Sequence, residues 1–410
     1  MRPGGANNPS PYGGITRIKS SVEARRSLSA FRLPFGCALI FPRPPDKPGA
    51  VRVQEWVAEC RRWKGMMMVI ARNMGELAGF AIPRLGMGTM ALAIEGRPDR
   101  ETAIETIHAG LDAGVRYLDT AWSYYLPSRP GTGTPEDLGY GERLVRDALR
   151  TWDGPRDEVL VATKTGYRRT MEEPVSVAQV SDLAESDAQG AQGAQGESAQ
   201  ERQHLQAAGS RYGWMADSRP ETMIRDAKES ALHLGVDALD LLYSHGPDPA
   251  VPYADQVGAL KQLLDEGVIR YAGISRVNNE QIDTARAMLG DKLIAVQNQF
   301  SPSHPDPEHT MGHCRELGLA FVCWSPLGGF LDAFDQRAYD PFRAVAGEHG
   351  CSYQRVVLAW ELAQYERLYT IPSARNPHEI NDSFAATGLE LTCDELARLN
   401  RAVFGGSRLC

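Results

Sequence analysis

Titratable side chains stand directly after short apolar runs of the sequence. Asp119, Lys164 and His245 each occupy such a position. Later runs end in the same manner, in Ser275, Asn298, Gln299, Trp324 and Ser325. An acid, an ammonium and an imidazole can together hold and transfer a proton. A helix cap or a core histidine would explain any one of them, but the repeated placement favours a catalytic site.

The apolar runs and the stretches between them indicate parallel β/α units. Eight runs have strand character: Gly86–Met90, Arg116–Asp119, Val159–Thr163, Leu239–Ser244, Ile269–Ile274, Leu293–Val296, Ala320–Trp324 and Leu368–Ile371. The spacers are amphipathic and predict helices over 100–113, 140–151, 219–234, 254–266, 278–289, 306–317, 340–364 and 376–386. Eight such units favour a single α/β (β/α)8 TIM barrel, whose strand ends converge on one mouth. A doubly wound open sheet is the alternative.

Two helix starts carry capping signals. Ser218 is predicted to be an N-cap, followed by Pro220 in the first turn and by Glu221 as the partner of a capping box. Thr392 and Glu395 have the same spacing and predict a further helix near the end of the chain.

Composition excludes several classes of protein. The 410 residues carry a net charge of −8, which argues against a nucleic-acid partner, and contain no apolar run of 18 residues, so no membrane span is expected. The seven cysteines are odd in number and include no C-x-x-C. They predict reduced thiols in a cytoplasmic protein rather than disulfides or a zinc site.

Two segments differ from the rest in composition. Residues 1–66 carry a net charge of +8 and lack periodicity, so residues 1–78 are predicted to be a disordered leader in front of a barrel over 79–405. One alternative is an organelle transit peptide. Another is that translation starts at one of the internal methionines near position 66, so that the segment is an extension upstream of the true start. Residues 169–210 contain a repeated Ala-Gln-Gly unit and predict a solvated, low-complexity insertion within the barrel.

The residues around these strand ends resemble the aldo-keto reductase family. The run from Gly114 to Tyr124 is similar to the family motif G-x-R-x-x-D-T-A-x-x-Y. Six further matches follow in family order: Val161-Ala162-Thr163-Lys164, Asp240–His245, Gly267–Ser275, Asn298-Gln299, Trp324–Leu327 and Ile371-Pro372. The resemblance covers about 82–405 and implies a (β/α)8 barrel and the reduction of an aldehyde or ketone.

The resemblance implies a catalytic tetrad of Asp119, Tyr124, Lys164 and His245. Tyr124 would donate the proton to the nascent alkoxide, and the ammonium of Lys164 would lower the pKa of that phenol. Asp119 would keep Lys164 charged, while His245 would position the carbonyl oxygen. Tyr125 is the adjacent rival for the acid, but the spacing from Asp119 favours Tyr124.

The same resemblance implies a nicotinamide cofactor, because no side chain supplies a hydride. No G-x-G-x-x-G follows a predicted strand, which argues against a Rossmann domain. The nicotinamide would stack on Trp324, with its carboxamide on Ser275 and Gln299. The remaining cofactor contacts are expected from Ser325, Pro326, Leu327, Arg375 and Asp382. The charge of Arg375 favours NADP(H), with NAD(H) as the alternative.

Two further hypotheses compete with the enzyme. A regulatory or sensor subunit that binds nicotinamide with little or no turnover would keep the same barrel and tetrad. A cluster of His304, His309, His313 and Cys314 could bind a metal, but it lacks the glutamate of an H-E-x-x-H motif, and we predict no metal site. The expected partner is a small carbonyl substrate. Neither its identity nor an oligomeric state is predicted.

Overall fold

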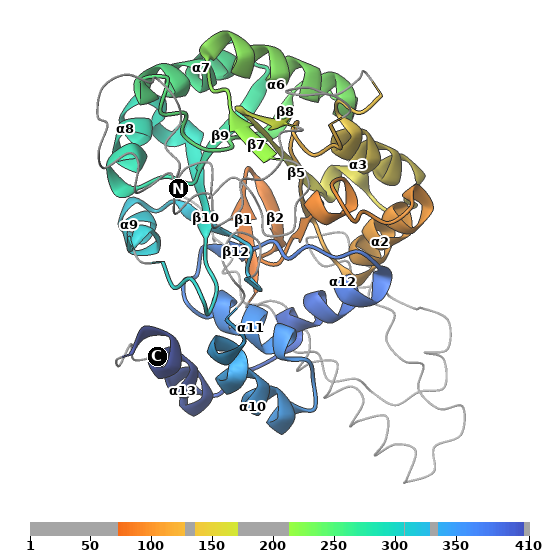
Figure 1. Ribbon diagram of the computed structural model, residues 1–410, viewed down its shortest axis with the longest axis vertical. Coiled ribbons are helices and arrows are strands. Elements are labelled where there is room, and N and C mark those ends of the chain that lie inside the picture. Colours follow the sequence, from red (N-terminus) through yellow and green to blue (C-terminus); the bar gives the residue numbers. More distant parts are fainter. Residues whose placement is uncertain (1–72, 128–135, 171–212, 307, 329–334, 406–410) are drawn as a thin grey trace, which may run out of the picture. The chain divides into compact units, whose positions relative to one another are not determined.

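The computed structural model describes residues 73–127, 136–170, 213–306, 308–328 and 335–405. Eight parallel strands form one sheet in the order β12-β11-β10-β9-β8-β5-β4-β3, and Figure 1 shows helices around it. The strands are β3 (Met87–Gly88), β4 (Tyr117–Asp119), β5 (Leu160–Thr165), β8 (Leu239–Ser244), β9 (Ile269–Ser275), β10 (Leu293–Gln299), β11 (Ala320–Trp324) and β12 (Leu368–Thr370). Each lies within or overlaps one predicted run, so all eight predicted strands are confirmed.

Backbone hydrogen bonds between the first and last strands close the sheet into a barrel. The amide of Gly86 donates to the carbonyl of Thr370 at 2.9 Å, and the amide of Thr370 donates to Arg84 at 2.9 Å. The amide of Gly88 donates to Pro372 at 3.0 Å. The strand order and this closure confirm the (β/α)8 barrel and exclude the open sheet.

Helices alternate with the strands. They are α2 (Arg100–Ala113), α3 (Tyr140–Thr151), α6 (Pro220–Leu234), α7 (Tyr253–Asp265), α8 (Asn279–Leu289), α9 (Thr310–Leu317), α10 (Asp340–His349), α11 (Tyr353–Leu362), α12 (Pro377–Phe384) and α13 (Cys393–Phe404). The single helix predicted over 340–364 is wrong. Helix α10 ends at His349, the next residue Gly350 has a left-handed φ of 61°, and Ser352 caps the start of α11. None of the helices in the described part of the chain combines the length and the apolar character that a membrane crossing requires.

The two predicted caps have different outcomes. Thr392 and Glu395 form the predicted capping box of α13. At α6, Pro220 is in the first turn as expected, but the N-cap is Arg219 and no side chain caps the helix. The hydroxyl of Ser218 instead donates to the carbonyls of Gly166 and Gly246, each at 3.3 Å. Ser218 therefore joins two strand ends rather than starting a helix.

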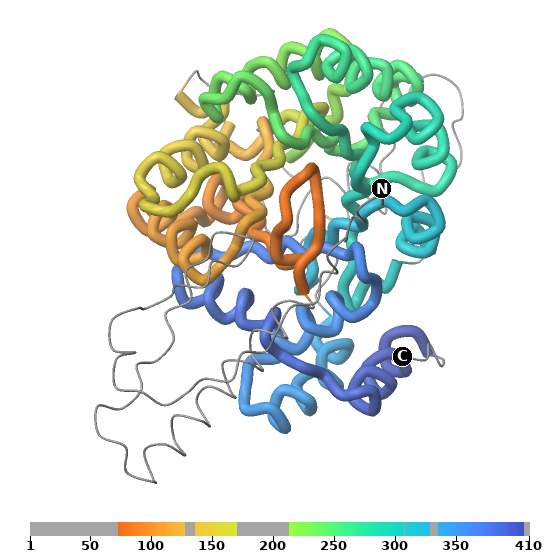
Figure 2. Tube along the Cα trace, turned by 180° about the vertical axis from the view of Figure 1, so that it is seen from behind, coloured from red at the N-terminus to blue at the C-terminus, as the bar shows by residue number. Residues whose placement is uncertain are grey.

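Two antiparallel hairpins were not predicted. Strands β1 (Met74–Leu77) and β2 (Phe80–Pro83) pair with each other, so the boundary of the leader at residue 78 is wrong and divides this hairpin. Figure 2 shows the hairpin in the middle of the ring of helices, and its Leu77 and Ile82 pack with residues of the barrel interior. Residues 1–72 of the predicted leader lie outside the described residues.

The second hairpin lies at the ends of the predicted insertion. Strands β6 (Tyr167–Thr170) and β7 (Gly213–Ala216) pair in register from Tyr167↔Ala216 to Thr170↔Gly213. Residues 169 and 170 therefore belong to a strand and not to the insertion, while residues 171–212 lie outside the described residues. The alternation of side chains that is typical of a strand covers too few residues on either side of the insertion to predict β6 and β7.

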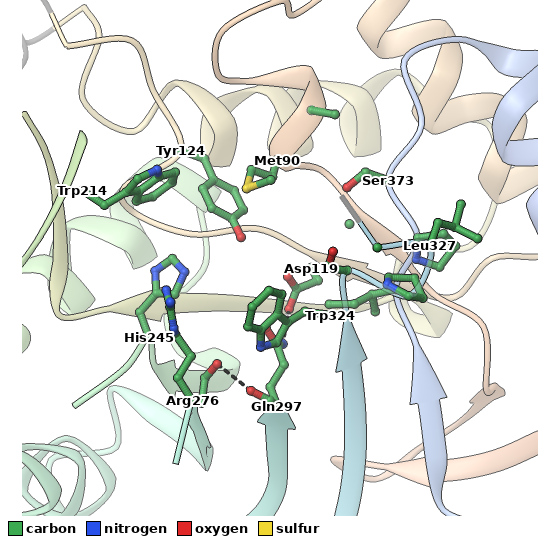
Figure 3. A pocket seen from close by; sticks show the side chains of 18 of the residues that line it. Met90, Asp119, Tyr124, Trp214, His245, Arg276, Gln297, Trp324, Leu327 and Ser373 are labelled. Carbon is green, nitrogen blue, oxygen red and sulfur yellow. Dashed lines mark hydrogen bonds between the residues drawn. The ribbon is translucent and has the colours of Figure 1, made fainter. Parts of the chain in front are cut away.

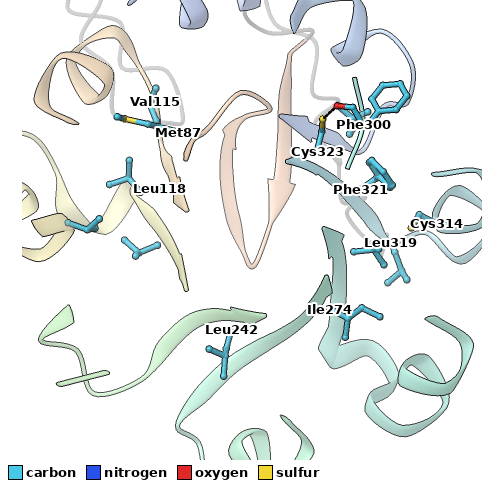
Figure 4. Packing of buried hydrophobic residues seen from close by; sticks show 14 of the residues in the cluster. Met87, Val115, Leu118, Leu242, Ile274, Phe300, Cys314, Leu319, Phe321 and Cys323 are labelled. Carbon is cyan, nitrogen blue, oxygen red and sulfur yellow. Dashed lines mark hydrogen bonds between the residues drawn. The ribbon is translucent and has the colours of Figure 1, made fainter. Parts of the chain in front are cut away.

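The barrel has an inner and an outer apolar layer because side chains alternate along each strand. In β8, Leu241 and Tyr243 pack inside the barrel with the β1–β2 hairpin, whereas Leu242 faces the surrounding helices. Figure 4 shows members of the outer layer, among them Leu118, Leu242, Ile274 and Phe321. Strands buried on both faces explain the nearly continuous apolar runs of the sequence.

A pair of glycine substitutions tests this packing. A Cβ at Gly273 in β9 would lie 2.3 Å from ring carbons of Tyr243, whereas one at Gly258 in α7 would meet nothing within 4 Å. Gly273→Ala should lower the free energy of unfolding by about 1–3 kcal/mol through overpacking. Gly258→Ala should raise it by up to about 1 kcal/mol through helix propensity. Urea denaturation measures both, and effects of the same sign would contradict this packing.

Candidate active site

The predicted catalytic side chains meet at one cavity of about 300 Å³ at the carboxyl ends of the strands. Asp119 ends β4, Lys164 lies near the end of β5, and His245 follows β8. Tyr124 follows β4 by five residues. Asp119, Tyr124 and His245 line the cavity, and Figure 3 shows the Tyr124 hydroxyl and the His245 ring on the same side of it. Lys164 lies behind Tyr124 and hydrogen-bonds to it.

A buried ion pair forms the base of the site. Lys164 and Asp119 are each only 1% exposed, and the ammonium donates directly to the carboxylate. The ammonium also donates to the carbonyl of Thr120 at 2.9 Å, and Nε2 of Gln297 donates to Oδ2 of Asp119 at 2.8 Å. These additional bonds satisfy both charges, which is the condition under which a buried pair is tolerated.

The third bond of the ammonium goes to Tyr124, the expected proton donor. Nζ of Lys164 lies 3.2 Å from the hydroxyl of Tyr124. Burial raises the pKa of Tyr124 above its usual value, while the nearby Lys164 opposes that shift. The pKa of Lys164 is raised because Asp119 and Tyr124 outweigh the effect of burial. The expected net lowering of the phenol pKa is therefore wrong, because burial exceeds the stabilisation by the ammonium. The phenol stays protonated beside a permanent cation.

The rival tyrosine lies elsewhere. Tyr125 is fully buried, its ring packs edge-on against Trp122 at 5.7 Å, and its hydroxyl accepts a long bond of 3.5 Å from the amide of Arg169. It is absent from the lining of the cavity. The geometry therefore favours Tyr124 as the acid.

The imidazole of His245 is held neutral. Burial, together with the charges of Lys164 and Arg276, lowers its pKa well below the usual value. Its Nδ1 lies 3.3 Å from the hydroxyl of Ser123, and its ring stacks on Tyr167 with 4.9 Å between centroids. A neutral imidazole whose Nδ1 is held by a hydrogen bond can donate a hydrogen bond from its other ring nitrogen to a substrate oxygen.

Most residues expected to contact the cofactor are brought together. The cavity is lined by Ser275, Trp324, Ser325, Pro326, Leu327 and Arg375. Figure 3 shows Trp324 and Leu327 across the cavity from Tyr124 and His245. The site thus has a side that carries the expected proton donor and a side that carries the residues expected to hold a nicotinamide.

Two of the expected contacts are not at this cavity. Gln299 lines a neighbouring polar cavity, whereas Gln297 lines the main one and also binds Asp119. Both stand near the end of β10, and the sequence alone did not show which of the two faces the barrel mouth. Asp382 lies on α12, where its carboxylate accepts bonds from Ser352 and Arg355. It serves the packing of α12 on α11 and is absent from the lining.

Other lining residues were not among the predicted site residues, although Ile371 and Pro372 belong to one of the family matches. They are Gly88, Met90, Ala91, Tyr167, Trp214, Arg276, Gly328, Ile371, Pro372 and Ser373. Trp214 comes from β7, across the insertion from β6, so only the pairing of the hairpin brings it to the mouth. Arg276 follows Ser275 directly, at the end of β9.

The histidine cluster has a structural explanation. His313 lies 2.7 Å from Asp283, and His309 precedes the first turn of α9 with a left-handed φ of 57°. Among the residues described by the structure, no group of three or more histidine, cysteine or acidic side chains is arranged to hold a metal ion.

Comparisons with known proteins agree with the barrel fold and identify the family. The model of the aldo/keto reductase family matches residues 84–403, and the chain therefore belongs to this family. Pyridoxine 4-dehydrogenase of Escherichia coli is 24% identical over 342 residues, which are 81% of this chain and 98% of that protein.

Two solved structures share the fold. A glycerol dehydrogenase from Gluconobacter oxydans has a TM-score of 0.59 at 21% identity, and the match covers 82% of this chain and 98% of that chain. An aldo/keto reductase from Klebsiella pneumoniae, solved in complex with NADP and acetate, has a TM-score of 0.54 at 22% identity, covering 79% and 92%.

The neutral state of His245 can be measured directly. In protein labelled with ¹⁵N-histidine, with His245→Gln to assign the signal, the ring nitrogens should keep the shifts of a neutral imidazole from about pH 8 to about pH 5.5. Since the folded-state pKa is depressed, His245 contributes stability that is present above about pH 6.5 and is lost as the pH falls towards the folded-state pKa. A titration midpoint near pH 6.5 would contradict this environment.

Proposed function

We propose that the protein reduces an aldehyde or ketone with NADPH and, in reverse, oxidises the alcohol. The observation that carries the proposal is the 3.2 Å contact between the buried Lys164 ammonium and the Tyr124 hydroxyl, at a cavity that His245 also lines. When bound, the dihydronicotinamide supplies a hydride to the carbonyl carbon. The residues of the chain must then supply a proton to the oxygen and hold the carbonyl in place.

Tyr124 is suited to donate that proton. Its raised pKa keeps the phenol protonated across the physiological range, and its hydroxyl faces the cavity. As the proton leaves, the developing phenolate lies beside an ammonium that Asp119 keeps charged and in place. The cation is already in position beside the phenol oxygen, so the surrounding groups need not reorganise to stabilise this negative charge.

His245 is suited to orient the substrate. Its ring is 5.9 Å from that of Tyr124, centroid to centroid, so one carbonyl oxygen could accept hydrogen bonds from both. Because the imidazole is neutral, it would act as a hydrogen-bond donor and leave the proton transfer to Tyr124. Two donors on one oxygen fix the carbonyl for attack.

The other side of the cavity fits a nicotinamide dinucleotide. Oγ of Ser325 is buried, and no described residue is its hydrogen-bond partner. Ser325 also has a left-handed φ of 51°, an uncommon conformation for a non-glycine residue. Trp324 would stack on the nicotinamide, with Ser275 and Gln297 near the carboxamide. We assign Gln297 this place instead of Gln299.

We infer a preference for NADP(H) over NAD(H). Arg375 is exposed at the edge of the cavity and could pair with a 2′-phosphate. The solved relative from Klebsiella pneumoniae that holds NADP supports the same assignment.

Matched substitutions of the two adjacent tyrosines test the proposal. Tyr124→Phe should lower kcat with NADPH and 4-nitrobenzaldehyde by about 10²-fold or more, because the proton donor is lost. NADPH binding, followed by fluorescence titration, should be unchanged. Tyr125→Phe, outside the cavity, should keep both properties.

Other outcomes separate the alternatives. Equal turnover by Tyr124→Phe and the unsubstituted protein would exclude Tyr124 as the acid. NADPH binding without turnover in the unsubstituted protein would favour the regulatory or sensor subunit over the enzyme.

A further inference from the structure

The β6–β7 hairpin brings a tryptophan to the mouth of the cavity. Trp214 in β7 lines the cavity, and its ring lies 6.1 Å from that of Tyr124 and 6.0 Å from that of His245, centroid to centroid. The indole stands at 88° to the first ring and at 72° to the second. Figure 3 shows the three side chains together on one side of the cavity. A carbonyl compound whose oxygen reaches Tyr124 and His245 would therefore lay its adjoining atoms against Trp214.

A buried arginine holds the indole in this position. Arg169 lies directly opposite Trp214 in the hairpin, so the two side chains share one face of it. The guanidinium carbon of Arg169 is 4.3 Å from the centroid of the Trp214 ring, and the side chain is completely buried. Glu95, which precedes α2, forms an ion pair with the same guanidinium. The cation thus covers one face of the indole and ties it to a second part of the barrel mouth.

The opposite face of the hairpin is anchored as well. Side chains alternate along β6, so Arg168 lies on the face away from Trp214. Its Nε donates to Asp217 at 2.8 Å, and its Nη2 donates to Asp226 of α6 at 3.2 Å. The hairpin is therefore fixed to the barrel through both of its faces. A wall fixed in this way loses little conformational freedom when a ligand packs against it.

The surroundings of the indole are apolar and aromatic. Trp214 belongs to a cluster of buried residues that contains no charged side chain; its other members are Ala93, Ile94, Ala121, Tyr124 and Tyr167. Met90 packs against this cluster and also lines the cavity. Aromatic rings attract one another edge to face or offset, at centroid separations of about 4.5–7 Å. A flat ring can take such a place among these side chains, whereas a puckered ring with the same number of carbons is thicker and has no π-face.

We propose that Trp214 is a specificity-determining residue, and that it selects carbonyl compounds whose carbonyl carbon is attached to a flat, uncharged, unsaturated ring. The inference rests on the proposed reductase function. Trp214 would contact the ring of the substrate, while Tyr124 and His245 act on its carbonyl oxygen. Arg169 would be a positioning residue, because it touches the indole and does not line the cavity.

Benzaldehyde and cyclohexanecarbaldehyde form the test pair, because their rings have six carbons each and differ in flatness. With NADPH, Trp214→Leu should lower the ratio of their kcat/KM values about 3- to 10-fold relative to the unsubstituted protein, mainly through a higher KM for benzaldehyde. The intrinsic reactivities of the two aldehydes cancel in this comparison. Trp214→Phe, which keeps an aromatic ring, should retain most of the ratio. Met215→Leu, the neighbouring position on the opposite face of the hairpin, is the matched control and should leave it unchanged.

A binding measurement tests the wall without turnover. Benzamide should bind the NADPH complex more tightly than cyclohexanecarboxamide, followed by the change in cofactor fluorescence, and Trp214→Leu should abolish the difference. If the ratio of the two aldehydes is the same in Trp214→Leu, or if Met215→Leu changes it equally, the inference is overturned while the reductase proposal stands. If benzamide is preferred through Trp214 but neither aldehyde is reduced, the reductase proposal is overturned and the ring-binding wall stands.

Discussion

The contact between Lys164 and Asp119 is the constraint on which the site depends. Both charges are almost completely buried, which is costly unless each is paired and hydrogen-bonded. Thr120 and Gln297 complete the set, and the remaining bond of the ammonium is directed at Tyr124. The pair therefore fixes the position of the phenol and supplies the charge that its conjugate base requires. Removal of either partner would leave an uncompensated ion in the interior.

The barrel makes this contact possible through strand register. Asp119 in β4 lies opposite Ala162 in β5, so Lys164 stands two residues further along the same inward face. Lys164 in turn lies opposite Tyr243 in β8, whose end leads directly to His245. Three neighbouring strands thus bring an acid, an ammonium and an imidazole to one mouth. The hairpin β6–β7, which follows β5, adds the aromatic wall at Trp214.

The strands, and the meeting of the candidate catalytic residues at one mouth, could be predicted because their signals are local. Apolar runs end in Asp119, Lys164 and His245, and the family motif places Tyr124 by spacing alone. Other features depend on tertiary structure. Gln297 and Gln299 are of the same type and stand two residues apart, and only their places in the folded barrel decide which of them lines the main cavity. The pKa of Tyr124 depends on how deeply the phenol is buried, and the spacing of Tyr124 and Lys164 along the sequence carries no information about that burial.

The central claim is that Asp119 and Lys164 act as one unit on Tyr124. The most direct measurement is the single-turnover rate of NADPH oxidation, with saturating aldehyde, in Asp119→Asn, Lys164→Met and the double variant. If the two residues form a unit, the double variant should lose about as much rate as Lys164→Met alone, because Asp119 acts through the cation and has no further role once the cation is gone. Losses that multiply would show that the two residues act independently and would contradict the account.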